Sequence, residues 1–330
     1  MSTKRLEQAA QATKTAFVFP GQGSQKVGML AELAEQFSVV KDTFTEASEA
    51  VDFDLWQIAQ SGEGLDQTEN TQPVLLTASI ALWRVWLELG GVAPKFLAGH
   101  SLGEYSALVA AEAMTLADAV KLVNLRGKLM QCAVPQGEGA MAAILGLADE
   151  KVIELCQKVN ASAAGQGSVE AANYNAQGQV VIAGSTALVQ QVMAEAKEQS
   201  GKAIALPVSV PSHCTLMKPA AEKFAEALEQ TAIELPRIPV IQNVNAEIAT
   251  DVAQLRQALT AQLYQSVQWT RTMQYLQDEG VQYVVECGPG TVLSNLAKRL
   301  PNIEKAFAID SKARMEDALN AVLVAEGKIA

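Results

Sequence analysis

The chain has 330 residues, of which 49% are hydrophobic and 18% are charged, and its formal net charge is -11. This composition supports a sizeable buried core and excludes a disordered or fibrous chain. The acidic balance disfavours binding to nucleic acid, which needs a basic surface.

Cysteine and histidine are too few and too scattered for a disulfide framework or a zinc site. The four cysteines form no CxxC pair, and the chain has two histidines. Buried, reduced thiols are the expected state. The polar start MSTKRLEQAAQATK does not have the pattern of a signal peptide. No run of about 18 apolar residues is found that would span a membrane. We therefore expect a soluble, cytoplasmic protein.

The first part of the chain alternates short apolar strands with helices. A strand is expected at Thr15–Pro20, followed at once by the turn Gly21-Gln22-Gly23. Helical periodicity then runs from Gly28 to about Ala50. The next elements are a helix at Gln72–Leu89 with Pro73 near its first turn, a strand at Lys95–Gly99, and helices at Leu102–Ala113 and Leu116–Val134.

The pattern changes at Pro135, where a small α+β insertion is expected. Its strands and helices are predicted at Met141–Leu145, Glu150–Val159, Glu170–Asn173, Gln179–Ala183, Thr186–Glu198 and Ala203–Val208. The main pattern resumes with a helix at Pro219–Ala232, strands at Val240–Val244 and Val281–Val285, and a final helix after Glu286–Gly290. Short strands that alternate with helices predict an α/β layered fold with a mostly parallel sheet.

Gly99-His100-Ser101-Leu102-Gly103 matches the G-x-S-x-G pattern of a nucleophile elbow. A predicted strand precedes the motif and a predicted helix follows it, as an elbow requires. The glycines permit a tight, strained turn that presents the Ser101 hydroxyl. The backbone N–H of Leu102, next after the serine, is well placed to donate to an oxyanion. An ordinary glycine-rich turn between a strand and a helix is the alternative.

A serine hydroxyl is a weak nucleophile and needs a base. His100 adjoins Ser101 in the elbow, where neighbouring side chains point in different directions, so a structural role is favoured for it. His213 lies in the loop Val210–Cys214 and is therefore the better candidate by elimination, with a structural loop histidine as the alternative. Common hydrolases have the order serine, acid, histidine, but no acid between Ser101 and His213 stands out.

Seven strings, in order, resemble the malonyl-CoA:acyl carrier protein transacylases of type II fatty acid synthesis. The resemblance extends from Thr15 to about Leu300, and acyltransferase domains of polyketide and animal synthases share several of the strings. The strings are FVFPGQGSQ (Phe17–Gln25), TQP (Thr71–Pro73), GHSLGEY (Gly99–Tyr105), LRGKLMQ (Leu125–Gln131), VPSH (Val210–His213), QLYQSVQW (Gln262–Trp269) and ECGPG (Glu286–Gly290).

The resemblance implies a catalytic role for each matching residue. Ser101 would be the acylated nucleophile and His213 its base. The backbone carbonyl of Gln262 would orient His213 in place of the carboxylate of an ordinary triad. Gln22 and Leu102 would supply the N–H groups of the oxyanion hole.

The resemblance also implies how the acyl group is bound. Arg126 would hold the malonyl carboxylate, with Met130 beside it. A guanidinium suits a planar carboxylate because it can donate two parallel hydrogen bonds, and it would select malonyl over acetyl. A surface arginine or a structural salt bridge is the alternative reading of Arg126.

The implied fold is a large hydrolase-like α/β domain of residues 1–136 and 207–330 that carries a small ferredoxin-like subdomain of residues 137–206. The implied reaction is ping-pong transfer of malonyl from malonyl-CoA to the phosphopantetheine thiol of holo acyl carrier protein, for fatty acid biosynthesis. No metal or other cofactor is expected, since coenzyme A is part of a substrate. We also expect a monomer with no nucleic-acid or membrane partner.

Two other functions remain open from the sequence. A serine thioesterase or esterase would differ in letting water attack the acyl-enzyme. A non-catalytic carrier-binding domain is a second alternative, against which the intact Ser101 and His213 count.

Overall fold

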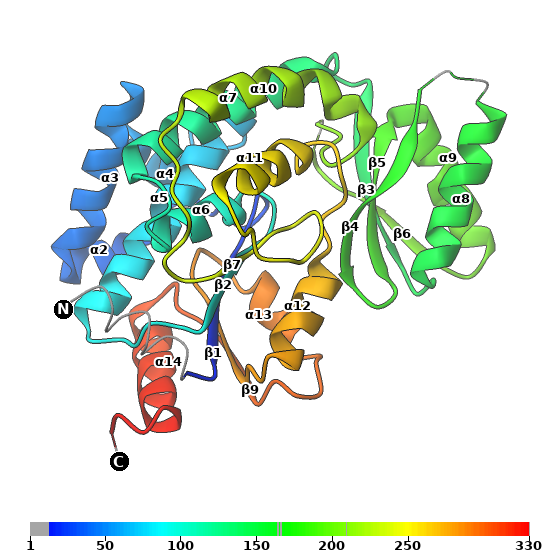
Figure 1. Ribbon diagram of the computed structural model, residues 1–330. Coiled ribbons are helices and arrows are strands. Elements are labelled where there is room, and N and C mark those ends of the chain that lie inside the picture. Colours follow the sequence, from blue (N-terminus) through cyan, green and yellow to red (C-terminus); the bar gives the residue numbers. More distant parts are fainter. Residues whose placement is uncertain (1–12, 164, 166, 209, 330) are drawn as a thin grey trace.

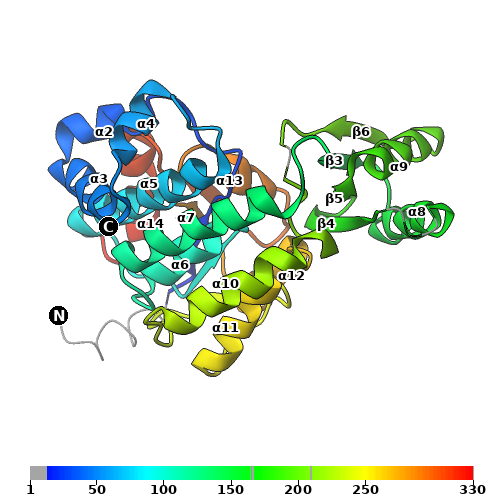
Figure 2. The ribbon, with the colours of Figure 1, turned by 90° about the horizontal axis from the view of Figure 1, so that it is seen from above.

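The computed structural model describes residues 13–163, 165, 167–208 and 210–329. Most of the polar N-terminal segment lies outside these residues. The chain forms a large body and a smaller sheet with two helices, which projects from one side of the body (Figures 1 and 2).

A five-stranded parallel sheet runs through the large body. Its strands lie in the order β7-β2-β1-β8-β9. Their bounds are β1 (Thr15–Phe19), β2 (Phe96–Gly99), β7 (Val240–Ile241), β8 (Tyr283–Glu286) and β9 (Lys305–Ala308). The central strand β1 is buried on both faces: Phe17 and Phe19 enter one apolar cluster, and Ala16 and Val18 enter another. Side chains that alternate between two buried faces explain why β1 reads as an unbroken apolar run.

Helices cover both faces of this sheet (Figure 1). The cluster around Phe17 and Phe19 includes residues of α3, α5, α6, α7 and α10, and the cluster around Ala16 and Val18 includes residues of α12 and α13. The helices are α2 (Ala31–Gln36), α3 (Ser38–Val51), α4 (Leu55–Ser61), α5 (Thr68–Glu88), α6 (Gly103–Ala110), α7 (Leu116–Ala133), α10 (Lys218–Gln230), α11 (Val252–Ala261), α12 (Trp269–Asp278), α13 (Val292–Ala297) and α14 (Lys312–Ala325), with a 3-10 turn at Thr215–Met217.

The smaller sheet is antiparallel, with the strand order β4-β5-β3-β6. Its elements follow one another as strand, helix, strand, strand, helix, strand, which is the ferredoxin-like arrangement. They are β3 (Gly139–Leu145), α8 (Asp149–Ser162), β4 (Val169–Ala176), β5 (Gln179–Ser185), α9 (Thr186–Glu198) and β6 (Lys202–Ala205). The α/β class, the parallel main sheet and the α+β insertion predicted from the sequence are thus confirmed.

Strand β4 joins the smaller sheet to the large body. The backbone N–H of Tyr174 donates to the carbonyl of Val267 at 2.9 Å, and the N–H of Val267 donates to the carbonyl of Ala172 at 2.9 Å. The hydroxyl of Ser266 donates to the carbonyl of Ala171 at 2.6 Å. These bonds place the edge of β4 beside the loop between α11 and α12.

Two helices differ from the prediction. The helix expected up to Ala50 is interrupted at Phe37, whose extended backbone (φ -123°) separates α2 from α3. Helix α5 begins earlier than predicted, so Pro73 lies inside it. Proline has no N–H to donate to the carbonyl of Glu69, and the side chain of Asn124 on α7 donates to that carbonyl instead, at 2.8 Å. The proline is therefore tolerated because α7 satisfies the carbonyl that it leaves without a helical partner.

The described residues contain no helix that is both long and apolar enough to cross a membrane. They also contain no group of three or more His, Cys, Asp or Glu side chains placed to hold a metal ion.

Candidate active site

The strained turn between β2 and α6 carries Ser101. Its φ is 54°, in the left-handed region that costs energy for a residue with a side chain. A Cβ at Gly99 would collide with the backbone of Gly103, and a Cβ at Gly103 would collide with the carbonyl of Phe19. The two glycines of the motif are therefore required by close packing of the strand, the turn and the helix.

The side chain of Asn243 braces this turn. Its Oδ1 accepts a hydrogen bond from the backbone N–H of Ser101 at 2.7 Å, and its Nδ2 donates to the carbonyl of Gly99 at 2.6 Å. One amide therefore holds both sides of the elbow, which stabilises the positive φ of Ser101.

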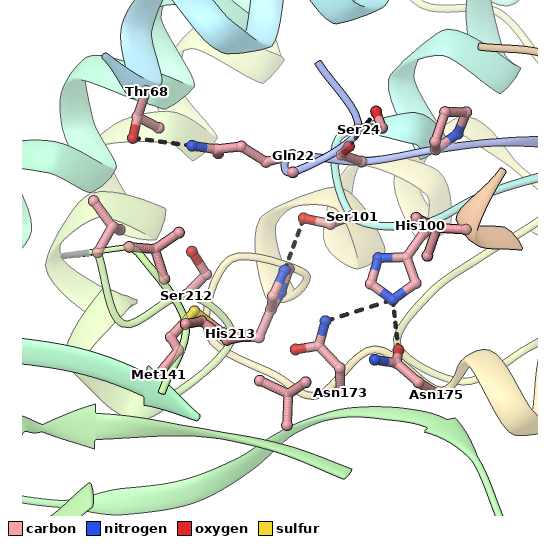
Figure 3. Close-up of a pocket in the computed structure, with 18 of the residues that line it drawn as sticks. Gln22, Ser24, Thr68, His100, Ser101, Met141, Asn173, Asn175, Ser212 and His213 are labelled. Carbon is pink, nitrogen blue, oxygen red and sulfur yellow. Dashed lines mark hydrogen bonds between the residues drawn. The ribbon is translucent and has the colours of Figure 1, made fainter. Parts of the chain in front are cut away.

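Ser101, His213 and Gln262 form a hydrogen-bonded chain. The distance from Ser101 Oγ to His213 Nε2 is 2.7 Å (Figure 3). His213 Nδ1 lies 2.7 Å from the backbone carbonyl oxygen of Gln262. Because a carbonyl only accepts, Nδ1 carries the proton and Nε2 is left to accept from the serine hydroxyl. A backbone carbonyl thus occupies the place that a carboxylate takes in an ordinary triad.

His213 is buried and its imidazole is neutral at rest. Burial, followed by the nearby charge of Arg126, lowers its pKa to about 3, and the hydrogen bond to Gln262 partly opposes this shift. A neutral imidazole can accept a proton, so the environment keeps His213 in the form that a general base requires.

Arg126 on α7 is buried beside the serine. Its Nη1 donates to Gln72 Oε1 at 2.9 Å, and its Nη2 donates to Gln262 Oε1 at 3.0 Å. Nη2 also lies 3.4 Å from Ser101 Oγ. A Cβ at Gly127 would lie 2.7 Å from Glu69 Cα. The glycine therefore allows α7 to approach α5 closely and brings Arg126 to Gln72.

The predicted oxyanion donors flank the serine. Gln22 lies in the turn after β1, and Leu102 directly precedes α6. A Cβ at Gly21 would lie 2.5 Å from the carbonyl oxygen of His100, so glycine lets the turn after β1 approach the elbow. The N-terminus of α6 also favours negative charge near Leu102.

A cavity of about 380 Å³ opens between the large body and the smaller sheet. Gln22, Ser101, Arg126, Met130 and His213 all line it, and Figure 3 shows several of these side chains with those of the small sheet opposite. This volume lies in the range that accommodates a small-molecule ligand.

His100 lies on the side of the cavity nearest the smaller sheet. Its Nε2 forms a 2.8 Å hydrogen bond with Asn175 Oδ1, and its ring lies 5.4 Å from that of Trp269. Burial lowers its pKa. Its ring is turned away from Ser101 (Figure 3), in agreement with the expectation that the two neighbouring side chains diverge.

Sequence reasoning missed four features of this site. Gln72 and Glu104 lie within the quoted strings TQP and GHSLGEY, yet no role was expected for either. Asn243 stands in no motif, and nothing in its sequence context identifies it. For Gln262 the prediction concerned the backbone carbonyl alone, whereas its side chain also bonds Arg126, the carbonyl of Ser101 and Glu104.

Known proteins resemble this chain over almost its whole length. The family model for the acyl transferase domain matches residues 16–315. A malonyl CoA-acyl carrier protein transacylase of Salmonella typhimurium is 51% identical over 310 residues, covering 93% of this chain and 99% of the relative. The crystal structure of FabD from Acinetobacter baumannii is 88% identical, with a TM-score of 0.93, and the match covers 95% of this chain and 99% of that chain.

A third comparison includes a carrier protein. The complex of a type II PKS acyl-carrier protein with its malonyl-transacylase gives 48% identity and a TM-score of 0.90, over 93% of this chain and 99% of that chain. The sequence identities, the coverage and the shared architecture all indicate the same family. The chain therefore belongs to the malonyl CoA-acyl carrier protein transacylases, a family of the acyl transferase domain.

Proposed function

We propose that this protein transfers the malonyl group of malonyl-CoA to the phosphopantetheine thiol of acyl carrier protein, and so supplies malonyl carrier protein for fatty acid biosynthesis. One observation supports this most strongly: the hydrogen-bonded pair Ser101–His213 and the guanidinium of Arg126 face the same cavity, with Nη2 of Arg126 3.4 Å from the serine oxygen. A nucleophile and a carboxylate-binding group at this separation suit a short acyl group with an acidic end.

The first half-reaction acylates the serine. His213 Nε2 takes the proton of Ser101 as Oγ attacks the thioester carbonyl carbon of malonyl-CoA. The negative charge that develops on the carbonyl oxygen is stabilised by the backbone N–H groups of Gln22 and Leu102. The carbon–sulfur bond then breaks, the coenzyme A sulfur receives the proton from His213, and a malonyl ester remains on Ser101.

The second half-reaction runs the same steps with a new thiol. The phosphopantetheine thiol loses its proton to His213 as its sulfur attacks the ester carbonyl. The bond to Ser101 breaks and Oγ recovers the proton from His213. Both steps use groups of this chain and of the two substrates, so the proposed mechanism requires no metal or redox cofactor.

Arg126 is proposed to hold the malonyl carboxylate through its guanidinium, and Met130 contributes to the wall beside it. The acidic end is thereby fixed while the thioester carbonyl lies at Ser101. Holding the reacting carbon near the nucleophile lowers the entropic part of the barrier.

We also propose that residues 137–206 act as a small subdomain on a large domain made of residues 1–136 and 207–330. The separate apolar cluster beneath β3, β4 and β5 supports this division. The small sheet contributes Met141, Asn173 and Asn175 to the cavity, so the substrate would bind between the two parts. A monomer in the cytoplasm is the proposed working form.

The acceptor of the malonyl group distinguishes this function from a thioesterase. Given labelled malonyl-CoA and holo carrier protein, the enzyme should place most of the label on the carrier. Free malonate should remain a minor product. When the carrier is omitted, malonate should still be released much more slowly than malonyl is transferred to the carrier. Label that accumulates mainly as malonate in the presence of carrier would instead identify a thioesterase.

A further inference from the structure

Glu104 is a carboxyl group buried behind the active site. It lies in the first turn of α6 and is 1% exposed. Its Oε2 accepts hydrogen bonds from Gln262 Nε2 at 2.7 Å and from the backbone N–H of Asn243 at 3.2 Å. The described side chains that line the cavity do not include Glu104, so it acts on the site through these partners.

Burying this carboxyl is costly. Burial raises its pKa to about 7, and the shift is opposed by the bonds from Gln262 and Asn243 and by the charge of Arg126. Its second oxygen, Oε1, has no hydrogen-bond partner among the described residues. An apolar side chain at this position would avoid burying a carboxyl, but it would leave the N–H of Asn243 and one N–H of Gln262 Nε2 without an acceptor. The carboxyl therefore serves these two donors, which a purely apolar packing residue could not do.

The hydrogen bonds of Gln262 fix the direction of its side-chain amide. Nε2 donates to Glu104 and also to the carbonyl of Ser101 at 2.9 Å, while Oε1 accepts from Arg126 at 3.0 Å. A carboxylate and a carbonyl can only accept, and a guanidinium can only donate. Turning the amide by half a turn would therefore lose all three bonds together.

Both partners of Glu104 hold reacting groups. The backbone carbonyl of Gln262 accepts from His213, and the side-chain oxygen of Gln262 holds Arg126. The side chain of Asn243 holds the elbow of Ser101. A single residue, Gln262 or Asn243, therefore connects the side chain of Glu104 to the nucleophile, to its base and to the guanidinium.

We infer that Glu104 is a positioning residue, which fixes the direction of the Gln262 amide and through it aims Arg126 at the acyl carboxylate. This inference rests on the proposed malonyl transfer. Glu104 touches no reacting atom, and its effect appears in the choice between acyl groups as well as in the rate.

The variant Glu104→Gln tests the inference because it keeps the shape of the side chain. Its neutral amide weakens the bond from Gln262 Nε2, or turns its own N–H₂ toward it, so one of the three bonds that fix the Gln262 amide is weakened or lost. Arg126 is then held by an acceptor that is itself held less firmly. We expect kcat/KM for malonyl-CoA to fall roughly 10- to 100-fold, as misplacement of a reacting group does. The value for acetyl-CoA should fall much less, so the malonyl-to-acetyl ratio should fall by about tenfold or more.

Glu286→Gln provides a matched control. Glu286 is also a buried carboxyl, but its oxygens accept from the backbone N–H groups of Leu293 and Ser294. This variant should lower the thermal midpoint while leaving the ratio unchanged. An equal change of ratio in Glu286→Gln, or an unchanged ratio in folded Glu104→Gln, would overturn the inference.

The route through Gln262 has its own test. Gln262→Met removes the amide but keeps the backbone carbonyl that binds His213, and it should lower the ratio as Glu104→Gln does. The double variant should lower it no further, because both changes remove one shared contact. If the fall of the malonyl-to-acetyl ratio in the double variant were the product of the falls in the two single variants, Glu104 would not act through Gln262.

A structure of Ser101→Ala with bound malonyl-CoA provides a measurement that needs neither Glu104 nor Gln262 to be replaced. The Gln262 amide should remain within hydrogen-bond distance of both Glu104 and Arg126, and an amide turned away from either would contradict the inference. Failure of the proposed function would look different: the unaltered enzyme would then not transfer malonyl at all.

Discussion

Replacing His213 by alanine should abolish most malonyl transfer while the protein remains folded. His213 is the imidazole hydrogen-bonded to Ser101, and its neutral state at rest lets it take the serine proton. Removal of a base of this kind lowers kcat by roughly 10⁴- to 10⁶-fold. The measurement is kcat/KM for malonyl-CoA, with thermal unfolding as the check on folding.

The backbone of His213 calls for a second variant. Its φ is 64°, and asparagine tolerates this left-handed conformation better than alanine does. His213→Asn should therefore be as inactive as His213→Ala but closer to wild-type stability. His100→Ala is the control at the other histidine, and it should lose much less activity. If His100→Ala were the more damaging change at equal stability, His213 would not be the base.

Replacing Arg126 by alanine should remove the preference for malonyl over acetyl. Two hydrogen bonds from a guanidinium to a carboxylate contribute roughly 1.5–3 kcal/mol each. Since about 1.4 kcal/mol is a factor of ten, their loss corresponds to roughly 10²- to 10⁴-fold in discrimination. kcat/KM for malonyl-CoA should fall by a factor of this size. kcat/KM for acetyl-CoA and for longer acyl-CoA should rise relative to the value for malonyl-CoA.

Arg126→Lys separates charge from geometry. Lysine keeps the positive charge but cannot donate two parallel bonds to one carboxylate, so an intermediate ratio is expected. It also cannot reach Gln72 and Gln262 with a planar fork, and part of the loss will come from those two amides. An unchanged malonyl-to-acetyl ratio in Arg126→Ala would place the specificity elsewhere in the cavity.

The sequence predicted the elements that have strong local signals. The apolar run of β1 and the glycines around Ser101 identified the central strand and the elbow. Helices α4, α11, α12 and α14 and strand β9 were missed. All of them except α14 have ten residues or fewer, which is too short for an apolar period to be distinguished from the surrounding sequence.

The residues of the candidate site also divide into those with a local sequence signal and those without one. Ser101 and His213 could be proposed from a motif and from the scarcity of histidine. The contacts of Arg126 with Gln72 and Gln262, and of Asn243 with Ser101, join residues that are 54, 136 and 142 positions apart. No local spacing predicts such pairs, since they are created by the packing of α5 on α7 and by the parallel order of β7, β2 and β1.

The central claim is that malonyl passes through an ester on Ser101, and the intact mass of the protein tests it most directly. Mixed with malonyl-CoA alone, the enzyme should gain the mass of one malonyl group, and adding holo carrier protein should return it to its starting mass. Ser101→Ala should gain nothing. Malonyl found on a cysteine such as the exposed Cys132, or rapid transfer to the carrier with no acylated enzyme at any time, would contradict the account.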